Sequence, residues 1–267
     1  EPLAPLCPKW VSSVAEPRRA TFISEPKRKL WHHGVEVEPL RKFDPEDRKI
    51  YHDTRYPWGT VCRIVAGESY GSGVIVGPRH VLTASHVVDW TRNGAGIVEV
   101  HRSGRLFVSA VSAITIARYY TKVTGQMVEW SEVDEDYAVL ITADRIGDRF
   151  GAFGVRTYDS AWDDEPYWYN IGYPGVPALG RGEKPIWQKR KWLDEDEWDF
   201  GSARSMTTDA DVNKGQSGGP LFAFWPKGRY PAGPYVVAVV SGEDDENWCA
   251  GGSDLTKLVR KARTDYP

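Results

Sequence analysis

Short apolar runs separated by turn residues fill the chain from Trp58 onward. Twelve Trp and thirteen Tyr accompany them, and large flat side chains suit the half-buried surface of a β-sheet. The runs predict strands at 60–66, 73–76, 80–83, 98–101, 106–110, 114–117, 137–142, 167–172, 221–224 and 235–240. No helical pattern alternates with them, so the sequence predicts an all-β fold of antiparallel barrels or sandwiches rather than a parallel α/β sheet.

The clearest helical pattern stands near the end of the chain, at 254–263. Its apolar face is expected to hold Leu255, Leu258, Val259 and Ala262. Ser253 is placed to act as the N-cap, and basic residues gather near the C-terminus, where they suit the helix dipole.

The first 50 residues differ from the rest, because they carry prolines at positions 2, 5, 8, 17, 26, 39 and 45 and two basic clusters. Proline at this density disfavours helices and central strands, so we expect residues 1–50 to form an extended arm, a possible pro-segment. A Gly- and Asp-rich stretch at 144–164 is the expected crossing between a first barrel at 51–150 and a second at 151–267. The segment 181–199 alternates basic and acidic clusters, and we interpret it as a solvated, internally salt-bridged loop rather than a partner-docking loop.

Composition excludes several classes of protein. The formal net charge is −3, so no global basic field favours nucleic acid or an anionic membrane as partner, and no run of about 18 apolar residues could span a bilayer. Cys7, Cys62 and Cys249 are too few for a disulfide-dense scaffold and wrongly spaced for zinc. At most one intrachain bridge can form, between Cys62 and Cys249 or through Cys7. The chain begins at Glu1 rather than Met, so we expect a processed protein from which any signal peptide has gone.

The strongest chemical signal is the segment Lys214-Gly-Gln-Ser217-Gly-Gly-Pro220. Glycines on both sides let a tight loop present a serine hydroxyl, and they let a substrate carbonyl approach backbone amides. The amides of Gly215 and Ser217 are the expected oxyanion hole. The segment also fits the nucleophile elbow of α/β-hydrolases, but that fold requires a histidine after the serine, and all six histidines precede Ser217.

The remaining partners of a serine nucleophile follow from local context. In Val81-Leu-Thr-Ala-Ser-His86, an apolar strand runs into small residues and stops at a histidine, which predicts an imidazole at a strand end, facing a cleft. Asp136 leads directly into a buried strand and lies between His86 and Ser217 in chain order. A carboxylate there would orient the imidazole and stabilise the imidazolium.

These three blocks resemble the active-site blocks of trypsin-like serine proteases. Asp47-Arg48, Tyr56-Pro-Trp58 and Ile171-Gly-Tyr-Pro-Gly175 further resemble the glutamyl-endopeptidase-like and fungal trypsin-like branch. The resemblance implies two antiparallel six-stranded barrels with the site in the cleft between them, and it covers residues 45 to 265. Vertebrate trypsins carry a cysteine after the histidine and, before the serine, an aspartate that receives a freed N-terminus. Here those positions hold Val87 and Gln216.

The same resemblance addresses substrate preference. Asp211 stands six residues before the serine, the offset at which trypsins carry the carboxylate that selects Arg or Lys. Val240, Ser241 and Gly242 are the expected wall of the substrate cleft, and this stretch lacks the histidine that the glutamyl branch uses to hold a substrate carboxylate. An acidic run at 243–246 follows, so we expect a basic P1 residue.

The sequence therefore predicts a secreted serine endopeptidase, monomeric, acting on protein or peptide substrates, with a C-terminal helix and a possible zymogen stage. No cofactor or metal is expected, since His32-His33 has no matching ligands and the chemistry needs none. The alternative from another class is a non-catalytic binding or regulatory protein on the same fold. An esterase on the same machinery is a third possibility.

Overall fold

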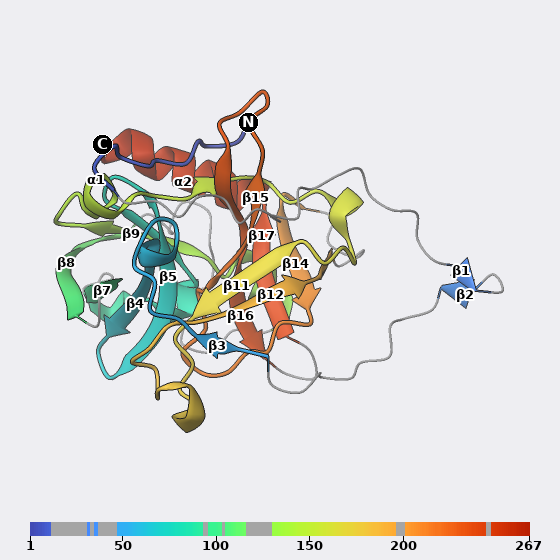
Figure 1. Ribbon diagram of the computed structural model, residues 1–267, viewed down its shortest axis with the longest axis horizontal. Coiled ribbons are helices and arrows are strands. Elements are labelled where there is room, and N and C mark those ends of the chain that lie inside the picture. Colours follow the sequence, from blue (N-terminus) through green and yellow to red (C-terminus); the bar gives the residue numbers. More distant parts are fainter. Residues whose placement is uncertain are drawn as a thin grey trace.

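The computed structural model describes residues 1–11, 31–32, 35–36, 47–92, 96–102, 105–115, 130–195, 201–243 and 247–267. Two curled β-sheets lie side by side, and a C-terminal helix lies along one end of them (Figure 1). A separate short hairpin pairs β1 (Trp31–His32) with β2 (Val35–Glu36).

The first sheet is a closed barrel with strand order β4-β5-β6-β9-β8-β7. Its strands are β4 (Val61–Ala66), β5 (Ser69–Gly77), β6 (His80–Thr83), β7 (Ile97–Arg102), β8 (Arg105–Thr115) and β9 (Ala138–Thr142). Apolar side chains such as Ile64, Ile75 and Leu140 fill the barrel interior. One long strand, β8, covers the strand expected at 106–110 and the first part of the strand expected at 114–117. It ends at Thr115, and residues 116–117 lie outside the described residues.

The second sheet contains nine strands, and its main order is β13-β14-β17-β16-β15-β11-β12-β3. These are β3 (Lys49–Ile50), β11 (Trp168–Gly172), β12 (Ile186–Lys191), β13 (Leu193–Glu195), β14 (Ala203–Thr208), β15 (Pro220–Trp225), β16 (Gly233–Glu243) and β17 (Asn247–Gly252). The ninth, β10 (Gly154–Val155), pairs in parallel with β16. The expected all-β class with two curled, mainly antiparallel sheets and a C-terminal helix is confirmed. In the described residues the second sheet is not closed into a barrel, and β3, β10 and β13 bring it to nine strands where six were expected.

The segment 181–199 corrects the sequence interpretation, because much of it is sheet rather than solvated loop. Strand β12 pairs with β11 along its length, and β13 pairs with β14. Gln188 and Lys191 are buried although both are polar, and Lys189 and Arg190 between them are exposed. These basic and amide side chains interrupt the alternation of apolar and polar residues from which strands are predicted, so the sequence did not indicate a strand here. Residues 196–200 lie outside the described part of the chain.

Helix α2 (Ser253–Asp265) occupies the place expected of it, and Leu255, Leu258 and Val259 are fully buried. Its N-cap is Gly252 and not Ser253. Gly252 has a φ of 91°, a conformation that side chains disfavour, and a Cβ there would lie 2.5 Å from the Ser202 carbonyl oxygen. The chain therefore needs glycine at the turn into the helix, which shifts Ser253 into the first helical position.

The expected crossing at 144–164 contains a short helix, α1 (Ile146–Phe150), and strand β10. The first residues of the chain lie against this crossing: Leu3 exchanges backbone hydrogen bonds of 2.8 and 2.9 Å with Val155, and Leu6 pairs in the same way with Ala152. Figure 1 shows this N-terminal segment running beside α2. Most of the predicted arm, including residues 12–30 and 37–46, lies outside the described residues, so its role as a pro-segment stays a prediction.

All three cysteines are free thiols in the structure. Cys62 lies inside the first barrel and Cys249 inside the second sheet, and burial raises the pKa of both thiols. Neither of the two pairings left open by the sequence forms.

Candidate active site

His86 and Asp136 come together at one end of the first barrel. His86 lies in a single 3₁₀ turn, Ser85–Val87, directly after β6, and Asp136 follows another 3₁₀ turn, Trp130–Glu135, directly before β9. Strands β6 and β9 are paired neighbours, so two residues flanking them in this way lie side by side. The imidazole Nδ1 is 2.7 Å from Oδ2 of Asp136, and the His86 backbone N–H donates to Oδ1 at 2.9 Å.

The carboxylate of Asp136 is fully buried and has a third donor. The hydroxyl of Ser241 donates to Oδ2 at 2.6 Å, across from β16 of the second sheet. A buried carboxylate is tolerated only when donors replace its hydration. Three donors therefore hold Asp136 with both oxygens engaged, and Nδ1 of His86 is the donor nitrogen of the ring, which leaves Nε2 to accept a proton.

Ser217 lies on a loop that is hydrogen-bonded to the first barrel. Its carbonyl oxygen accepts a hydrogen bond of 2.7 Å from the backbone N–H of Ser72 in β5. A Cβ added to Gly71 would lie 2.6 Å from a methyl of Val87 and 3.0 Å from the same carbonyl oxygen, so the neighbour of His86 and the backbone of Ser217 meet at Gly71. The structure brings the histidine turn and the serine loop to one place, between the two sheets.

The glycines beside Ser217 are required by geometry at two positions. Gly215 has a φ of 97° and Gly218 a φ of 81°, both in the region that side chains disfavour. A Cβ on Gly218 would lie 2.2 Å from the hydroxyl oxygen of Thr83 and 2.8 Å from the Ala84 amide. Glycine thus lets the serine loop pack closely against Thr83 at the end of β6, three residues before His86.

Two carbonyl groups fix the direction of the amides expected to form the oxyanion hole. The carbonyl of Lys214 accepts from the Gly175 amide at 2.8 Å, and the carbonyl of Gln216 accepts from the Gly219 amide at 2.8 Å. In a planar trans peptide the C=O and the following N–H point in opposite directions. The N–H of Gly215 and that of Ser217 therefore point away from these two hydrogen-bonded carbonyl groups. Pinned amides of this kind are what stabilisation of developing negative charge requires.

Ser72 links the serine loop to the first barrel in a way that sequence reasoning missed. Its hydroxyl donates to the Gly215 carbonyl at 2.7 Å and accepts from the Tyr173 amide at 2.9 Å, and it is fully buried. No local motif marks Ser72, since its partners lie more than 100 residues away. The only signal was the glycine on either side of it, which indicates close backbone approach.

The structure describes the surroundings of the residues expected to select substrate, and their role stays a prediction. The backbone of Asp211 is tied down from both sides: its N–H donates to Oε1 of Gln188 at 2.9 Å, and its carbonyl accepts from Gln188 and Gln216. Val240 is fully buried and exchanges backbone hydrogen bonds with Gly218 and Gly219. The Ser241 hydroxyl donates to Asp136, and the strand has a bulge between Val240 and Gly242 at this point. The acidic run at 244–246 lies outside the described residues.

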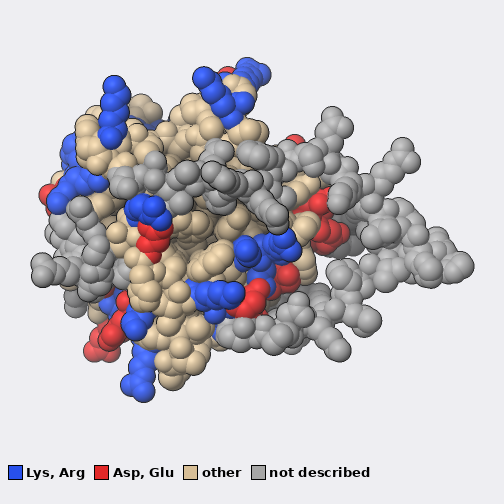
Figure 2. Space-filling model, viewed as in Figure 1, with Lys and Arg blue, Asp and Glu red and all other residues tan. Residues whose placement is uncertain are grey.

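Other candidate groups stay apart from this site. His80, buried in β6, lies 2.9 Å through Nε2 from the Ala262 carbonyl oxygen, and burial lowers its pKa to about 4. Within the described residues, no three His, Cys, Asp or Glu side chains gather as metal ligands. No helix in the described part of the chain is long and apolar enough to cross a membrane. On the face shown in Figure 2, basic and acidic side chains are interspersed over the described surface.

The comparisons with known proteins agree with this geometry. A family model described as "Trypsin-like peptidase domain" matches residues 71–228, more than half of the chain. The chain belongs to the trypsin-like peptidases. The resemblance to this family drawn from the sequence is thereby confirmed.

Individual relatives of this trypsin-like peptidase are distant. Glutamyl endopeptidase of Bacillus licheniformis is 24% identical over 220 residues, which cover 80% of this chain and 63% of the relative. The chain thus spans less than two thirds of that relative's length. Among solved structures, a Glu endopeptidase in complex with MPD superposes with a TM-score of 0.63 at 17% identity, over 83% of this chain and 98% of the other. Protease Anisep from Arthrobacter nicotinovorans gives a TM-score of 0.57 at 15% identity, over 81% and 99%. These two structures show the chymotrypsin-like fold.

Proposed function

We propose that this trypsin-like peptidase hydrolyses peptide bonds with Ser217 as nucleophile, His86 as general base and Asp136 as the orienting carboxylate. One observation carries the proposal: a fully buried carboxylate donates no proton but accepts from the His86 ring, the His86 backbone and the Ser241 hydroxyl. This arrangement fixes the ring tautomer, so that Nε2 takes the proton of the serine hydroxyl as it attacks the scissile carbonyl.

The steps that follow use the same groups in both directions. The imidazolium returns its proton to the leaving amine, and the acyl group stays on Ser217 until water repeats the cycle. The amides of Gly215 and Ser217 hold the oxyanion of each tetrahedral intermediate. Their fixed orientation supports this role, because donors that need no rearrangement contribute most when charge develops.

We propose a basic P1 residue, selected by the carboxylate of Asp211. The rigid backbone of Asp211 supports a positioning role, since charge-assisted hydrogen bonds discriminate best from a fixed site. A second candidate is cleavage after Glu, favoured by the similarity to proteins named glutamyl endopeptidase and Glu endopeptidase. The stretch 239–242, which matches the strand where the glutamyl branch carries a histidine, contains none. This departure supports the basic preference.

Fluorogenic peptides that differ only at P1 (Arg, Lys, Glu or Ala) test both levels of the proposal. We expect turnover by the intact chain, loss of turnover in Ser217→Ala, and the highest kcat/KM with Arg or Lys. Preference for Glu would replace the specificity proposal and leave the peptidase standing. No turnover with any peptide, together with tight binding of one, would favour the non-catalytic binding protein. Faster turnover of esters alone would favour an esterase.

The remaining expectations form part of the same proposal: the protein is secreted and monomeric, it acts on protein or peptide substrates, and residues 1–50 form an arm that acts as a pro-segment. Fractionation of expressing cells and light scattering of the purified chain test the first two. Detection of the bulk of the chain in the cell pellet, or of a stable dimer, would contradict them.

A further inference from the structure

Arg48 reaches the loop that carries the nucleophile, although it lies about 170 positions earlier in the chain. Its Nη1 donates to Oδ1 of Asn213 at 2.7 Å and to Oε1 of Gln216 at 2.8 Å. Gln216 directly precedes Ser217, and Asn213 stands two residues before Gly215. One guanidinium nitrogen therefore bridges two side chains of the stretch that presents the nucleophile and the oxyanion amides.

The side chain of Gln216 passes this contact on to the backbone. It is fully buried, its Oε1 also accepts from the Asn213 amide at 3.0 Å, and its Nε2 donates to the Asp211 carbonyl at 2.9 Å. With Arg48 in place, both acceptor sites of Oε1 are filled. Without it, a buried acceptor would lose a charged donor inside the loop.

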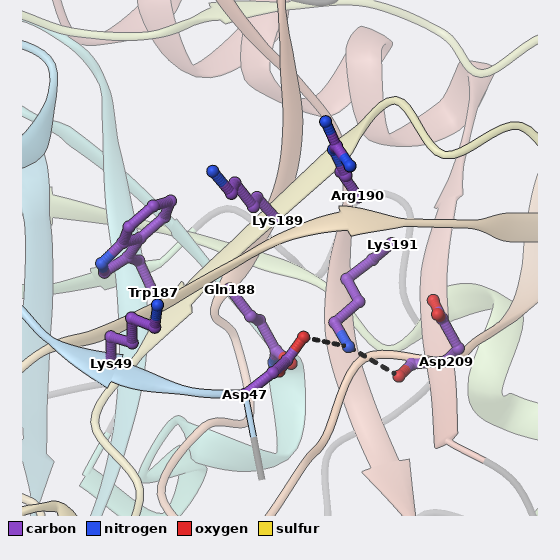
Figure 3. Close-up of a pocket in the computed structure, with 8 residues that line it drawn as sticks. All are labelled: Asp47, Lys49, Trp187, Gln188, Lys189, Arg190, Lys191 and Asp209. Atoms are coloured by element: carbon purple, nitrogen blue, oxygen red, sulfur yellow. Dashed lines mark hydrogen bonds and ion pairs between the residues drawn. The ribbon is translucent and has the colours of Figure 1, made fainter. Parts of the chain in front are cut away.

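The chain on both sides of Arg48 is anchored, as Figure 3 shows for the pocket beside it. Asp47 forms an ion pair of 2.9 Å with the buried Lys191, whose ammonium also reaches the Asp209 carbonyl at 3.3 Å. On the other side, Lys49 pairs with Trp187 in the β3–β12 ladder. The backbone at Arg48 is therefore fixed on the second sheet, which sets the position of the guanidinium.

We propose that Arg48 is a positioning residue that holds the serine loop in its active conformation through Gln216 and Asn213. Vertebrate trypsins place an aspartate before the serine to receive a freed chain end; here a neutral amide at that position accepts from a guanidinium within the chain. The loop is therefore organised without a new N-terminus. This inference rests on the proposed peptidase function. It also shortens the arm proposed at residues 1–50: any removable part ends before Asp47, because Asp47 contacts the second sheet and Arg48 contacts the serine loop.

The test compares Arg48→Met with Lys49→Met in the full chain. Lys49 is the next residue in the chain, at the start of β3, and it is exposed, so its replacement makes the same change in charge. We expect Arg48→Met to lower kcat by on the order of 10²-fold with little change in KM, because the loss falls on donors that act in the transition state. Lys49→Met should stay within about twofold of the wild type. Arg48→Lys should recover part of the loss, since an ammonium can also donate to both acceptors.

A fluorophosphonate separates positioning from folding. The final stoichiometry of labelling measures the fraction of chains that are folded. The rate of labelling measures the reactivity of Ser217, which depends on the conformation of the oxyanion loop. We expect Arg48→Ala to reach normal stoichiometry slowly and to be accelerated by millimolar guanidinium, with no acceleration of the wild type. Lower stoichiometry at the normal rate would mean that Arg48 only stabilises the fold, and wild-type rates in Arg48→Met would also overturn the proposal. A wild-type chain that neither labels nor hydrolyses peptides would overturn the peptidase function itself.

Discussion

Replacement of Asp136 by Asn tests the hydrogen bonding at the carboxylate in detail. An amide has one acceptor oxygen and one donor NH2, whereas Asp136 accepts donors at both oxygens. If the NH2 group took the place of Oδ1, it would face the backbone N–H of His86. A backbone N–H can only donate, so two donors would then face each other. With NH2 in the place of Oδ2, it faces the imidazole and the Ser241 hydroxyl, and both of these can turn to accept. The second orientation is the one we expect.

In that orientation Nδ1 of His86 becomes an acceptor, so the ring proton moves to Nε2. A protonated Nε2 cannot take the proton of Ser217. We therefore expect kcat for peptide hydrolysis to fall on the order of 10⁴-fold, about 5.5 kcal/mol of transition-state stabilisation, with KM nearly unchanged. The assay is steady-state hydrolysis of the best P1 peptide, with a thermal melt to verify folding.

Asp134→Asn is the matched control, because it removes the same charge two residues earlier from a half-exposed position. We expect it to stay within about twofold of the wild type. A loss of less than about tenfold in a folded Asp136→Asn chain would refute the reasoning, since it would mean that the tautomer of His86 does not depend on this carboxylate.

Three further outcomes follow from named contacts. Ser241→Ala should lower the free energy of unfolding by about 1.5–3 kcal/mol in urea titrations, because the buried Asp136 loses a donor; an unchanged midpoint would contradict this. Asp211→Ser should lower kcat/KM for Arg and Lys peptides on the order of 10²-fold or more, and an unchanged P1 profile would exclude Asp211 as the selecting residue. His80 has its pKa lowered by burial from 6.5 to about 4, so unfolding takes up a proton between these pH values and stability falls as the pH falls through that window. Between about pH 7.5 and 4.5 the wild type should therefore lose about 2–3 kcal/mol more than His80→Gln, and parallel losses would show that the ring is not buried as a neutral group.

The three blocks of the candidate active site could be predicted from the sequence because each is a local pattern. Each block can be recognised from its neighbours in the sequence: the glycines around Ser217, the apolar strand that ends near His86, and the carboxylate of Asp136 before a strand. Chain order then excluded the α/β-hydrolase interpretation. Strands such as β6, with its run of apolar and β-branched residues, were predicted to the residue for the same reason.

The supporting residues could not be predicted, because each acts through partners far along the chain. Ser72 contacts a loop more than 140 residues away, and Arg48 one about 165 residues away. Strand β12 was missed because it buries Gln188 and Lys191, whose polar groups bind distant carbonyls and a carboxylate. Polar residues at buried positions break the alternation on which strand prediction rests.

The central claim is that Ser217 is activated as a nucleophile, and serine-directed labelling tests it most directly. The intact chain and Ser217→Ala are incubated with a fluorophosphonate, and the adduct is located by mass spectrometry of the digested protein. We expect one label per chain, on the peptide that contains Ser217, and none in the variant. Equal labelling of both chains, or labelling at another residue, would contradict the account.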